Sequence, residues 1–329
     1  MGTIRIRFFL ASSAGTAGGE AMTIDELNAV IDADEIGDFI LVCEARQVKA
    51  LSRIADTITA NPKLRLVLLA GPSSSGKTTT AKRLVTQLAV NGRKAMIVST
   101  DDYFVGDKLN PRDENGELDY EHVDCVDRAR LAKDMNALMR GEDVVMRKFD
   151  FAAHEGFDDS KATRLPEGGI VILEGIHALN PRLTEGIADE CKFKIYIEPR
   201  TQVVVFAASR LPPSDGRLLR RLVRDNRYRK MNPIETFRLW PKVRAGEKKW
   251  IEPFAAGADA FFDSGLEYEL SVLKRYVAGL LEKVRLRMPE EAKAEVLALL
   301  LRAVRDADPM KVPGDSILRE TIGGSLLEY

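Results

Sequence analysis

Short apolar runs alternate along the chain with segments of helical spacing. The runs at 66–70 and 170–173 are entirely apolar, and those at 94–98 and 193–197 each contain a single lysine. Runs of this kind are typical of strands buried on both faces of a parallel sheet. Helical segments between them are expected at 80–90 and 129–140. The alternation predicts an α/β fold with a doubly wound, mainly parallel sheet.

Helical spacing also occurs before the first of these strands. Residues 23–33 begin with Thr23, followed three positions later by Glu26, which is the capping-box pattern of a helix N-terminus. A second amphipathic helix is expected from about residue 44 to residue 59. We predict that these two helices form a small appendage that leads into the first strand.

The C-terminal third of the chain is expected to be largely helical. Asn232 and Glu235, with a proline between them, form a capping signature for a helix that runs to about residue 245. After an edge strand at 258–262, residues 268–286 are predicted to form a helix that packs on the sheet. A Leu/Ala-rich helix follows at 290–304, and a loosely structured tail is expected after it.

These patterns divide the chain into a central α/β domain and flanking parts. The central part is long enough to bury a sizeable core, and within it residues 143–151 are expected to form strands beside a substrate cleft. The expected boundaries are 1–20 for a leader, 21–62 for an N-terminal helical segment, 63–285 for the α/β domain and 286–329 for the C-terminal helices and tail.

Composition and charge place the chain among ordinary globular proteins. Of its 329 residues 45% are hydrophobic and 30% charged, and the formal net charge is −1. This balance argues against a dedicated nucleic-acid-binding or membrane-surface protein. The three cysteines are scattered, which suits a reducing cytoplasm, and no apolar run approaches the roughly 20 residues of a membrane-spanning helix. We expect a cytoplasmic protein without a membrane partner; whether it forms a homo-oligomer stays open.

The first apolar run leads directly into a glycine-rich loop. The sequence G-P-S-S-S-G-K-T at 71–78 matches the P-loop pattern between a predicted strand and a predicted helix. Its glycines let backbone N–H groups point at phosphate oxygens, so we predict a P-loop NTPase fold that binds a nucleoside triphosphate. Lys77 would reach the β- and γ-phosphates, and Thr78 would hold Mg²⁺. The predicted nucleotide-binding residues are Gly71, Ser73, Ser74, Ser75, Gly76, Lys77, Thr78 and Thr79.

Acidic residues follow two other apolar runs. Asp101 and Asp102 come after the run at 94–98, and Glu174 follows the run at 170–173. A kinase needs a carboxylate to orient or deprotonate the attacking hydroxyl. We predict this role for Asp101, one strand over from the loop, with Asp102 as the competing candidate and the capping of a turn as the structural alternative. Glu174 is expected to hold Mg²⁺, directly or through water.

A basic segment at about 210–232 is predicted to be a lid. Cations brought up to a triphosphate would neutralise charge on the transferred phosphoryl group. A solvated helix face and an RNA-binding patch are the alternatives, although Tyr228 is the one aromatic residue there that could stack on a base. The arginines spaced to share one helix face are Arg217, Arg220, Arg221 and Arg224.

Six motifs in the same order resemble the uridine kinase/phosphoribulokinase family of P-loop kinases over about residues 63–284. The resemblance implies a phosphotransferase in which Asp101 is the catalytic base. It also implies that Arg221, Arg224 and Arg229 face the nucleotides, with Arg224 among the catalytic and the acceptor-binding residues. Besides the loop, the motifs are S-T-D-D-Y-F at 99–104, D-Y-E-H-V-D at 119–124, K-F-D-F-A-A-H at 148–154, L-E-G-I at 173–176 and the arginine segment at 217–229.

The same resemblance implies an acceptor pocket lined by Glu121, Phe149, Phe151 and His154. Glu121 stands where the family has the shorter Asp, and Phe149 replaces a tyrosine. Met231 takes the place of the last arginine of the lid. A tyrosine hydroxyl bonded to a base can separate related substrates by orders of magnitude, so these departures bear on selectivity for pyrimidines.

A closer resemblance is to bacterial uridine-kinase-like proteins with a threonyl-tRNA-synthetase-like domain in front of the kinase. The motifs that fit this subgroup are W-P-x-V-x-x-G-E at 240–247, Y-E-L at 268–270 and V-P-x-x-S-I-L-R at 312–319. The front domain is expected to be absent, because the sequence contains no H-x-x-x-H.

The predicted function is phosphorylation of the 5′-hydroxyl of a nucleoside, with uridine and cytidine as first candidates. ATP or GTP would be the phosphate donor and Mg²⁺ the cofactor. Two alternatives stay open: a P-loop kinase of another hydroxylated small metabolite, and a nucleotide-dependent RNA-binding or regulatory protein.

Overall fold

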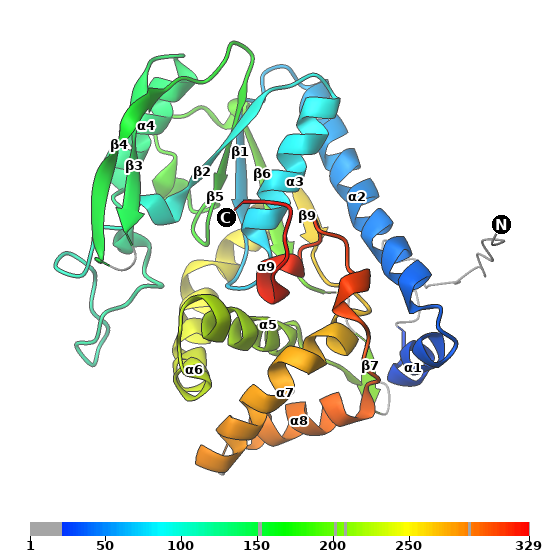
Figure 1. Cartoon of the computed structure of the whole chain (residues 1–329). Helices are drawn as coiled ribbons and strands as arrows, with labels where there is room; N and C mark the ends of the chain where they lie inside the picture. Colours follow the sequence, from blue (N-terminus) through cyan, green and yellow to red (C-terminus); the bar gives the residue numbers. More distant parts are fainter. Residues whose placement is uncertain (1–21, 151–152, 201–202, 207–208, 289–290, 329) are drawn as a thin grey trace.

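The computed structural model describes residues 22–150, 153–200, 203–206, 209–288 and 291–328. Its centre is a five-stranded sheet with the strand order β2-β5-β1-β6-β9, in which each neighbouring pair is parallel (Figure 1). The prediction of an α/β fold with a doubly wound, parallel sheet is confirmed. The strands are β1 (Leu66–Ala70), β2 (Ala95–Ser99), β5 (Ile170–Glu174), β6 (Lys192–Glu198) and β9 (Ala260–Asp263).

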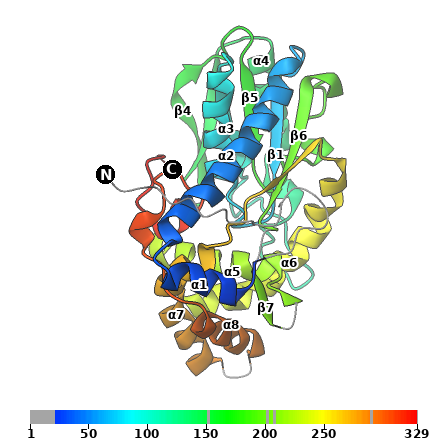
Figure 2. The same cartoon turned by 90° about the vertical axis from the view of Figure 1, so that its right-hand side faces the viewer.

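Two apolar clusters cover the two faces of this sheet. Leu66 and Leu68 of β1 point to the face covered by α4, whereas Val67 and Leu69 point to the face covered by α2 and α3. Figure 2 shows α2 and α3 side by side across that face. The C-terminal half of α2 is therefore part of the sheet's core, and the prediction of a small appendage is wrong for this helix. The bounds are α2 (Ile36–Ala60), α3 (Lys77–Val90) and α4 (Arg128–Met139).

A helical region lies beyond the carboxyl ends of the strands (Figure 1). Its apolar core joins α1 and the start of α2 to the four helices that follow β6 and β9. α7 contacts α5, α6 and α8, so the prediction that it packs on the sheet is wrong. The bounds are α1 (Ile24–Asp32), α5 (Pro213–Tyr228), α6 (Pro233–Trp250), α7 (Glu269–Arg287) and α8 (Ala292–Ala303).

Both predicted capping boxes are present. The Thr23 hydroxyl accepts a hydrogen bond from the N–H of Glu26, whose carboxylate accepts one from the N–H of Thr23. Asn232 and Glu235 make the same reciprocal pair at the start of α6. α6 runs past the predicted end at residue 245 to Trp250, because its buried face continues.

Two antiparallel ribbons stand apart from the main sheet. β3 (Val144–Asp150) and β4 (Glu155–Thr163) form the longer one, whose side chains are largely exposed. It contacts α4 and the turn η1 that follows β2. The shorter ribbon pairs β7 (Val204–Phe206) with β8 (Ser209–Arg210). The turn-like 3₁₀ helices are η1 (Thr100–Tyr103), η2 (Val123–Cys125), η3 (Pro181–Leu183), η4 (Asp189–Cys191) and η5 (Glu252–Gly257).

The residues after α8 return to the sheet and end beside α3 (Figure 1). They include η6 (Pro309–Lys311) and the short helix α9 (Arg319–Ile322). Ile317 and Leu318 are buried and belong to two different apolar clusters. The prediction of a loosely structured tail is therefore wrong.

Candidate active site

Two glycines shape the loop between β1 and α3. A Cβ atom on Gly71 would lie 2.2 Å from the carbonyl oxygen of Ile197, so glycine alone fits this close approach. Gly76 has a φ of 86°, in the left-handed region that favours glycine. α3 begins at the next residue, Lys77. The free N–H groups of the loop and of the first helical turn can therefore converge on phosphate oxygens.

Lys77 folds back over this loop. Its Nζ donates a hydrogen bond of 3.1 Å to the carbonyl oxygen of Pro72. Burial lowers the pKa of Lys77, while the charges of Glu174 and Asp101 raise it. The lysine and the two acidic residues predicted to carry the chemistry thus share one electrostatic environment.

Glu174 ends β5 beside the first turn of α3. β5 pairs with β1 so that Glu174 lies opposite Leu69, and the Thr78 hydroxyl donates to its Oε1 at 3.3 Å. Burial, followed by the charge of Asp101, raises the pKa of Glu174 to about 7. A hydroxyl and a carboxylate are the hard oxygen ligands that Mg²⁺ takes together with phosphate oxygens and water. The donor set fits this ion, although the described residues hold no group of three or more His, Cys, Asp or Glu suited to a metal.

Asp101 lies in η1, immediately after β2. Because β5 separates β2 from β1, Asp101 is two strands from the loop and not one as predicted. It still interacts with the loop: burial raises its pKa, and the charges of Lys77 and Arg229 lower it. Asp102 is engaged elsewhere, in an ion pair of 2.9 Å with Lys148 on β3. The geometry favours Asp101 over Asp102 as the carboxylate of the site.

The arginines expected to face nucleotides gather around one aspartate. Arg221 and Arg224 form ion pairs of 3.1 and 2.7 Å with the buried Asp225, and Arg229 lies 3.7 Å from it. Arg221 also donates from Nη1 to the hydroxyl oxygen of Ser73 at 2.9 Å. This end of α5 therefore places positive charge against the glycine-rich loop.

Glu247 of α6 is a residue of the site that was not predicted. Its carboxylate accepts hydrogen bonds from the backbone N–H of Ser73 at 3.0 Å and from Nη1 of Arg217 at 2.6 Å. Arg217 also donates to the carbonyl oxygen of Ser73 at 2.9 Å, and Arg244 binds the same carboxylate. The motif at 240–247 contains Glu247, but its spacing gives no sign of a contact 174 residues away in the sequence.

Comparison with known proteins shows which family contains these motifs. The model of the phosphoribulokinase/uridine kinase family matches residues 66–271, which is well over half of the chain. The chain belongs to this family. As a member it is a phosphotransferase that acts on a hydroxyl acceptor. The matched region contains the loop, both acidic residues at the strand ends and the arginines of α5.

The relatives of this kinase are distant in sequence, but the match covers most of the length of each relative. The uridine kinase of Deinococcus deserti is 25% identical over 209 residues, which cover 63% of this chain and 91% of that protein. The uridine kinase of Lactobacillus helveticus is 26% identical over 209 residues, with 63% and 90% covered. A solved structure titled a possible uridine kinase from Bacillus stearothermophilus is 19% identical, covers 67% of this chain and 100% of its own, and has a TM-score of 0.44.

One predicted acceptor residue of the kinase, Glu121, lies against α6. A Cβ atom on Gly246 would lie 2.3 Å from the Cβ of Glu121, so the helix approaches this residue closely. Burial raises the pKa of Glu121 to about 7, and the charge of Arg221 lowers it. The structure thus places Glu121 beside α6 and close enough to Arg221 of α5 for their charges to interact.

Two other predicted acceptor residues, Phe149 and His154, belong to the β3–β4 ribbon. The Phe149 ring packs edge-on against Phe104, with 5.7 Å between ring centroids. His154 occupies the turn between the two strands with a φ of 55°, and its Nδ1 lies 3.2 Å from Asp107. Phe151 lies outside the described residues. The ribbon thus presents its turn to the segment that follows Asp101.

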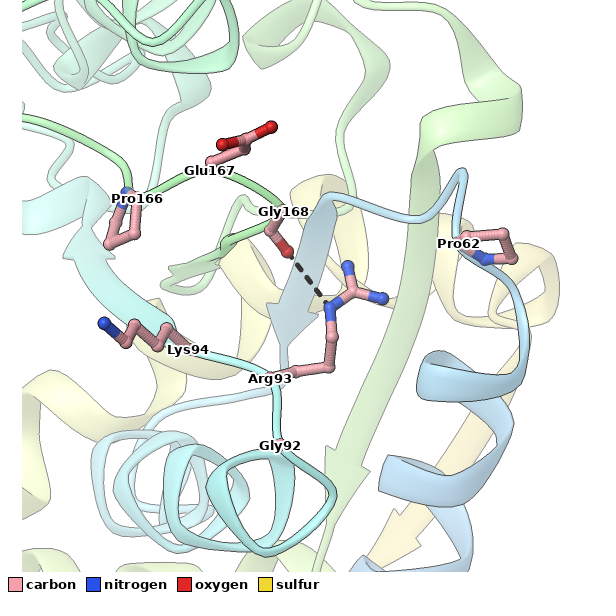
Figure 3. Close-up of a pocket in the computed structure, with 7 residues that line it drawn as sticks. All are labelled: Pro62, Gly92, Arg93, Lys94, Pro166, Glu167 and Gly168. Carbon is pink, nitrogen blue, oxygen red and sulfur yellow. Dashed lines mark hydrogen bonds between the residues drawn. The ribbon is translucent and has the colours of Figure 1, made fainter.

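An open depression of about 510 Å³ lies at the opposite end of the kinase's sheet (Figure 3). Its residues precede β1, β2 and β5, and Arg93 donates from Nε to the carbonyl oxygen of Gly168 at 3.0 Å. None of the residues predicted to bind nucleotide or acceptor lines it.

In the described part of the chain, helices long and apolar enough to cross a bilayer are absent.

Proposed function

We propose that this kinase transfers the γ-phosphate of ATP or GTP to the 5′-hydroxyl of a nucleoside in a Mg²⁺-dependent reaction. Uridine and cytidine are the first candidates as acceptors. The observation that supports the proposal best is the convergence of Lys77, the Thr78–Glu174 pair and Asp101 at one edge of the sheet. The distant relatives named uridine kinase agree with it.

The donor side would be held by the glycine-rich loop and its helix. Backbone N–H groups of the loop would bind phosphate oxygens, and Lys77 would exchange its bond to Pro72 for the β- and γ-phosphates. Thr78 and Glu174 would hold Mg²⁺, which, when bound, would neutralise charge on the phosphates. Arg221, Arg224 and Arg229 would add positive charge from the other side.

Asp101 would act on the acceptor. Its carboxylate would accept the proton of the attacking hydroxyl while the hydroxyl oxygen forms a bond to the γ-phosphorus and the bond to the β–γ bridging oxygen breaks. The products would be the phosphorylated acceptor and the nucleoside diphosphate. Because burial raises the pKa of Asp101, the carboxylate is a stronger proton acceptor than one in water.

Acceptor choice would depend on Glu121, Phe149, His154 and the undescribed Phe151. Phe149 has no hydroxyl to bond a base, which is the feature that favours the alternative of another hydroxylated metabolite. The RNA-binding alternative receives less support, since Arg217 and Arg220 are buried against Glu247 and Glu269 and are not displayed to solvent.

A coupled assay of nucleoside diphosphate release tests the proposal. The purified chain would be given ATP or GTP with Mg²⁺ and a panel of nucleosides, sugars and other alcohols. We expect release that depends on a nucleoside and stops with EDTA or in the variant Lys77→Ala. Release with sugars alone would identify the alternative kinase, and no release with any acceptor would contradict the proposal.

A further inference from the structure

The segment from residue 309 to 322 is firmly built into the kinase, although it lies outside the family-matched region. Ile317 packs in the cluster that contains α2, α3 and the sheet, while Leu318 and Ile322 pack in the helical region. The guanidinium of Arg319 donates to the carbonyl oxygens of Pro309, Val312, Pro313 and Gly323. Such a network fixes the segment in one position.

This segment reaches the glycine-rich loop from the outside. A Cβ atom on Gly76 would lie 2.4 Å from Cγ2 of Ile317, so the two are in close contact. The Thr79 hydroxyl, in the first turn of α3, donates a hydrogen bond of 2.7 Å to Oε2 of Glu320. The cavity left between the loop, α5 and the segment has a volume of about 10 Å³, which is room for about one water molecule.

Glu320 therefore places a carboxylate beside the first turn of α3, the part of the helix that would attract a phosphate. The N-terminus of a helix favours anions, and in P-loop proteins the first turn after the loop receives the nucleotide's phosphates. Glu320 is also close enough to Lys77 and Glu174 for its charge to raise the pKa of both, after larger effects of burial and of other residues. Its charge lies on the donor side of the site.

We propose that Glu320 is a further residue of the donor-nucleotide site, whose negative charge weakens the binding of the nucleotide's phosphates. The inference rests on the proposed function, because it requires the nucleotide to occupy the glycine-rich loop. Glu320 sets the donor affinity: the triphosphate competes with a carboxylate that the fold holds permanently against the first turn of α3. The repulsion grows with the number of charges on the nucleotide.

Isothermal titration calorimetry with ATP, ADP and adenosine, each with Mg²⁺, tests this on the full chain and on Glu320→Gln. The variant keeps the size of the side chain and can still accept from Thr79, so the thermal unfolding midpoint should stay unchanged. We expect the Kd for ATP to fall about tenfold, the Kd for ADP to fall less and the Kd for adenosine to stay the same. Asp315→Asn is the matched control: it removes one exposed charge from the same segment and should leave all three values unchanged.

Two results would overturn the inference while leaving the proposed function intact. An unchanged Kd for ATP in Glu320→Gln would show that the charge does not oppose binding. A Kd that rises equally for ATP and adenosine would show that Glu320 bonds the nucleoside part. If neither protein binds ATP and no acceptor supports diphosphate release, the proposed function fails and this inference fails with it.

Discussion

The proposed donor side and the proposed acceptor side of the site differ in how firmly the fold holds them. Glu174 and Glu247 are almost fully buried, and each bonds the glycine-rich loop or the first turn of α3. On the other side, the side chain of His154 is 51% exposed, and Phe149 lies on a ribbon whose residues mostly face solvent. The proposed donor side is pre-organised by buried ion pairs, whereas the proposed acceptor side, apart from Glu121 against α6, lies on an exposed hairpin.

This contrast suggests a division of labour. Buried, bonded groups keep their geometry without a ligand, which suits phosphoryl transfer because the charges must be in place beforehand. Groups on a surface ribbon tolerate change, which suits the choice of acceptor. We therefore expect donor-side substitutions to reduce stability or turnover and ribbon substitutions to change the KM of the acceptor.

The largest effect should come from Glu247→Ala. Removing this carboxylate leaves the buried Arg217 without its ion-pair partner and the N–H of Ser73 without its acceptor. Loss of one member of a buried ion pair costs about 3–5 kcal/mol, and urea denaturation should show this loss. Glu252→Ala, which removes an exposed partner of Arg244, should change stability by less than about 0.5 kcal/mol. Equal effects of the two substitutions would contradict the proposed rigidity of the donor side.

A smaller but catalytic effect is expected for Asp101→Asn. Without the base, turnover should fall by a factor of about 10² or more, which is about 2.7 kcal/mol, while the KM for ATP stays nearly the same. Asp102→Asn breaks the ion pair with Lys148 and should reduce turnover no more than severalfold. Steady-state kinetics of both variants test which aspartate is the catalytic base. Full activity of Asp101→Asn would refute this role for Asp101.

The burial of Glu174 should appear in the pH dependence of stability without nucleotide. Its pKa of about 7 in the fold lies above the ordinary 4.5, so its stabilising contribution is complete below pH 4.5 and is lost as the pH rises through 7. Between pH 5 and 8 the wild type should lose about 2–3 kcal/mol relative to Glu174→Gln, which cannot ionise. Parallel pH profiles of the two proteins in urea denaturation would show that Glu174 is not responsible. Mg²⁺ should reduce the difference by binding the ionised form.

The smallest effect is expected on the ribbon. Phe149→Ala removes a ring that packs on Phe104 and is predicted to border the acceptor, so the acceptor KM should rise about tenfold, with the KM for ATP unchanged. Phe157→Ala on β4 is the control, because this ring is 54% exposed on the same ribbon, and it should leave both KM values within about twofold. A rise in the KM for ATP with Phe149→Ala would contradict the proposal that the ribbon affects acceptor binding alone.

Local patterns in the sequence are enough to predict the central strands and the glycine-rich loop. The apolar runs at 66–70 and 170–173 became central strands, and the two capping boxes formed where Thr23 and Asn232 predicted them. These features depend on a few neighbouring residues, so spacing reveals them. The same reasoning predicts that acidic residues at strand ends lie close together, since strand ends in a parallel sheet meet at one edge.

Contacts between distant segments could not be read in this way. A helical period shows that the helix at 268–286 has an apolar face but not whether a sheet or other helices cover that face. The strand order, which moved Asp101 one strand further from the loop, is likewise a property of the whole fold. Glu247 contacts the loop from 174 residues away, and Glu320 contacts the first turn of α3 from 241 residues away. No local spacing encodes such contacts.

The anchoring of α5 also limits how the site can move. To swing away as a rigid body, α5 would have to break the buried pairs Arg217–Glu247 and Arg220–Glu269, which is too costly to occur often at equilibrium. The end of the helix is less constrained, because Arg229 is exposed there and Lys230 has a φ of 53°. Nucleotide exchange should therefore proceed by rearrangement of this last turn, and backbone amides there should exchange their hydrogens with solvent faster than those at the start of α5.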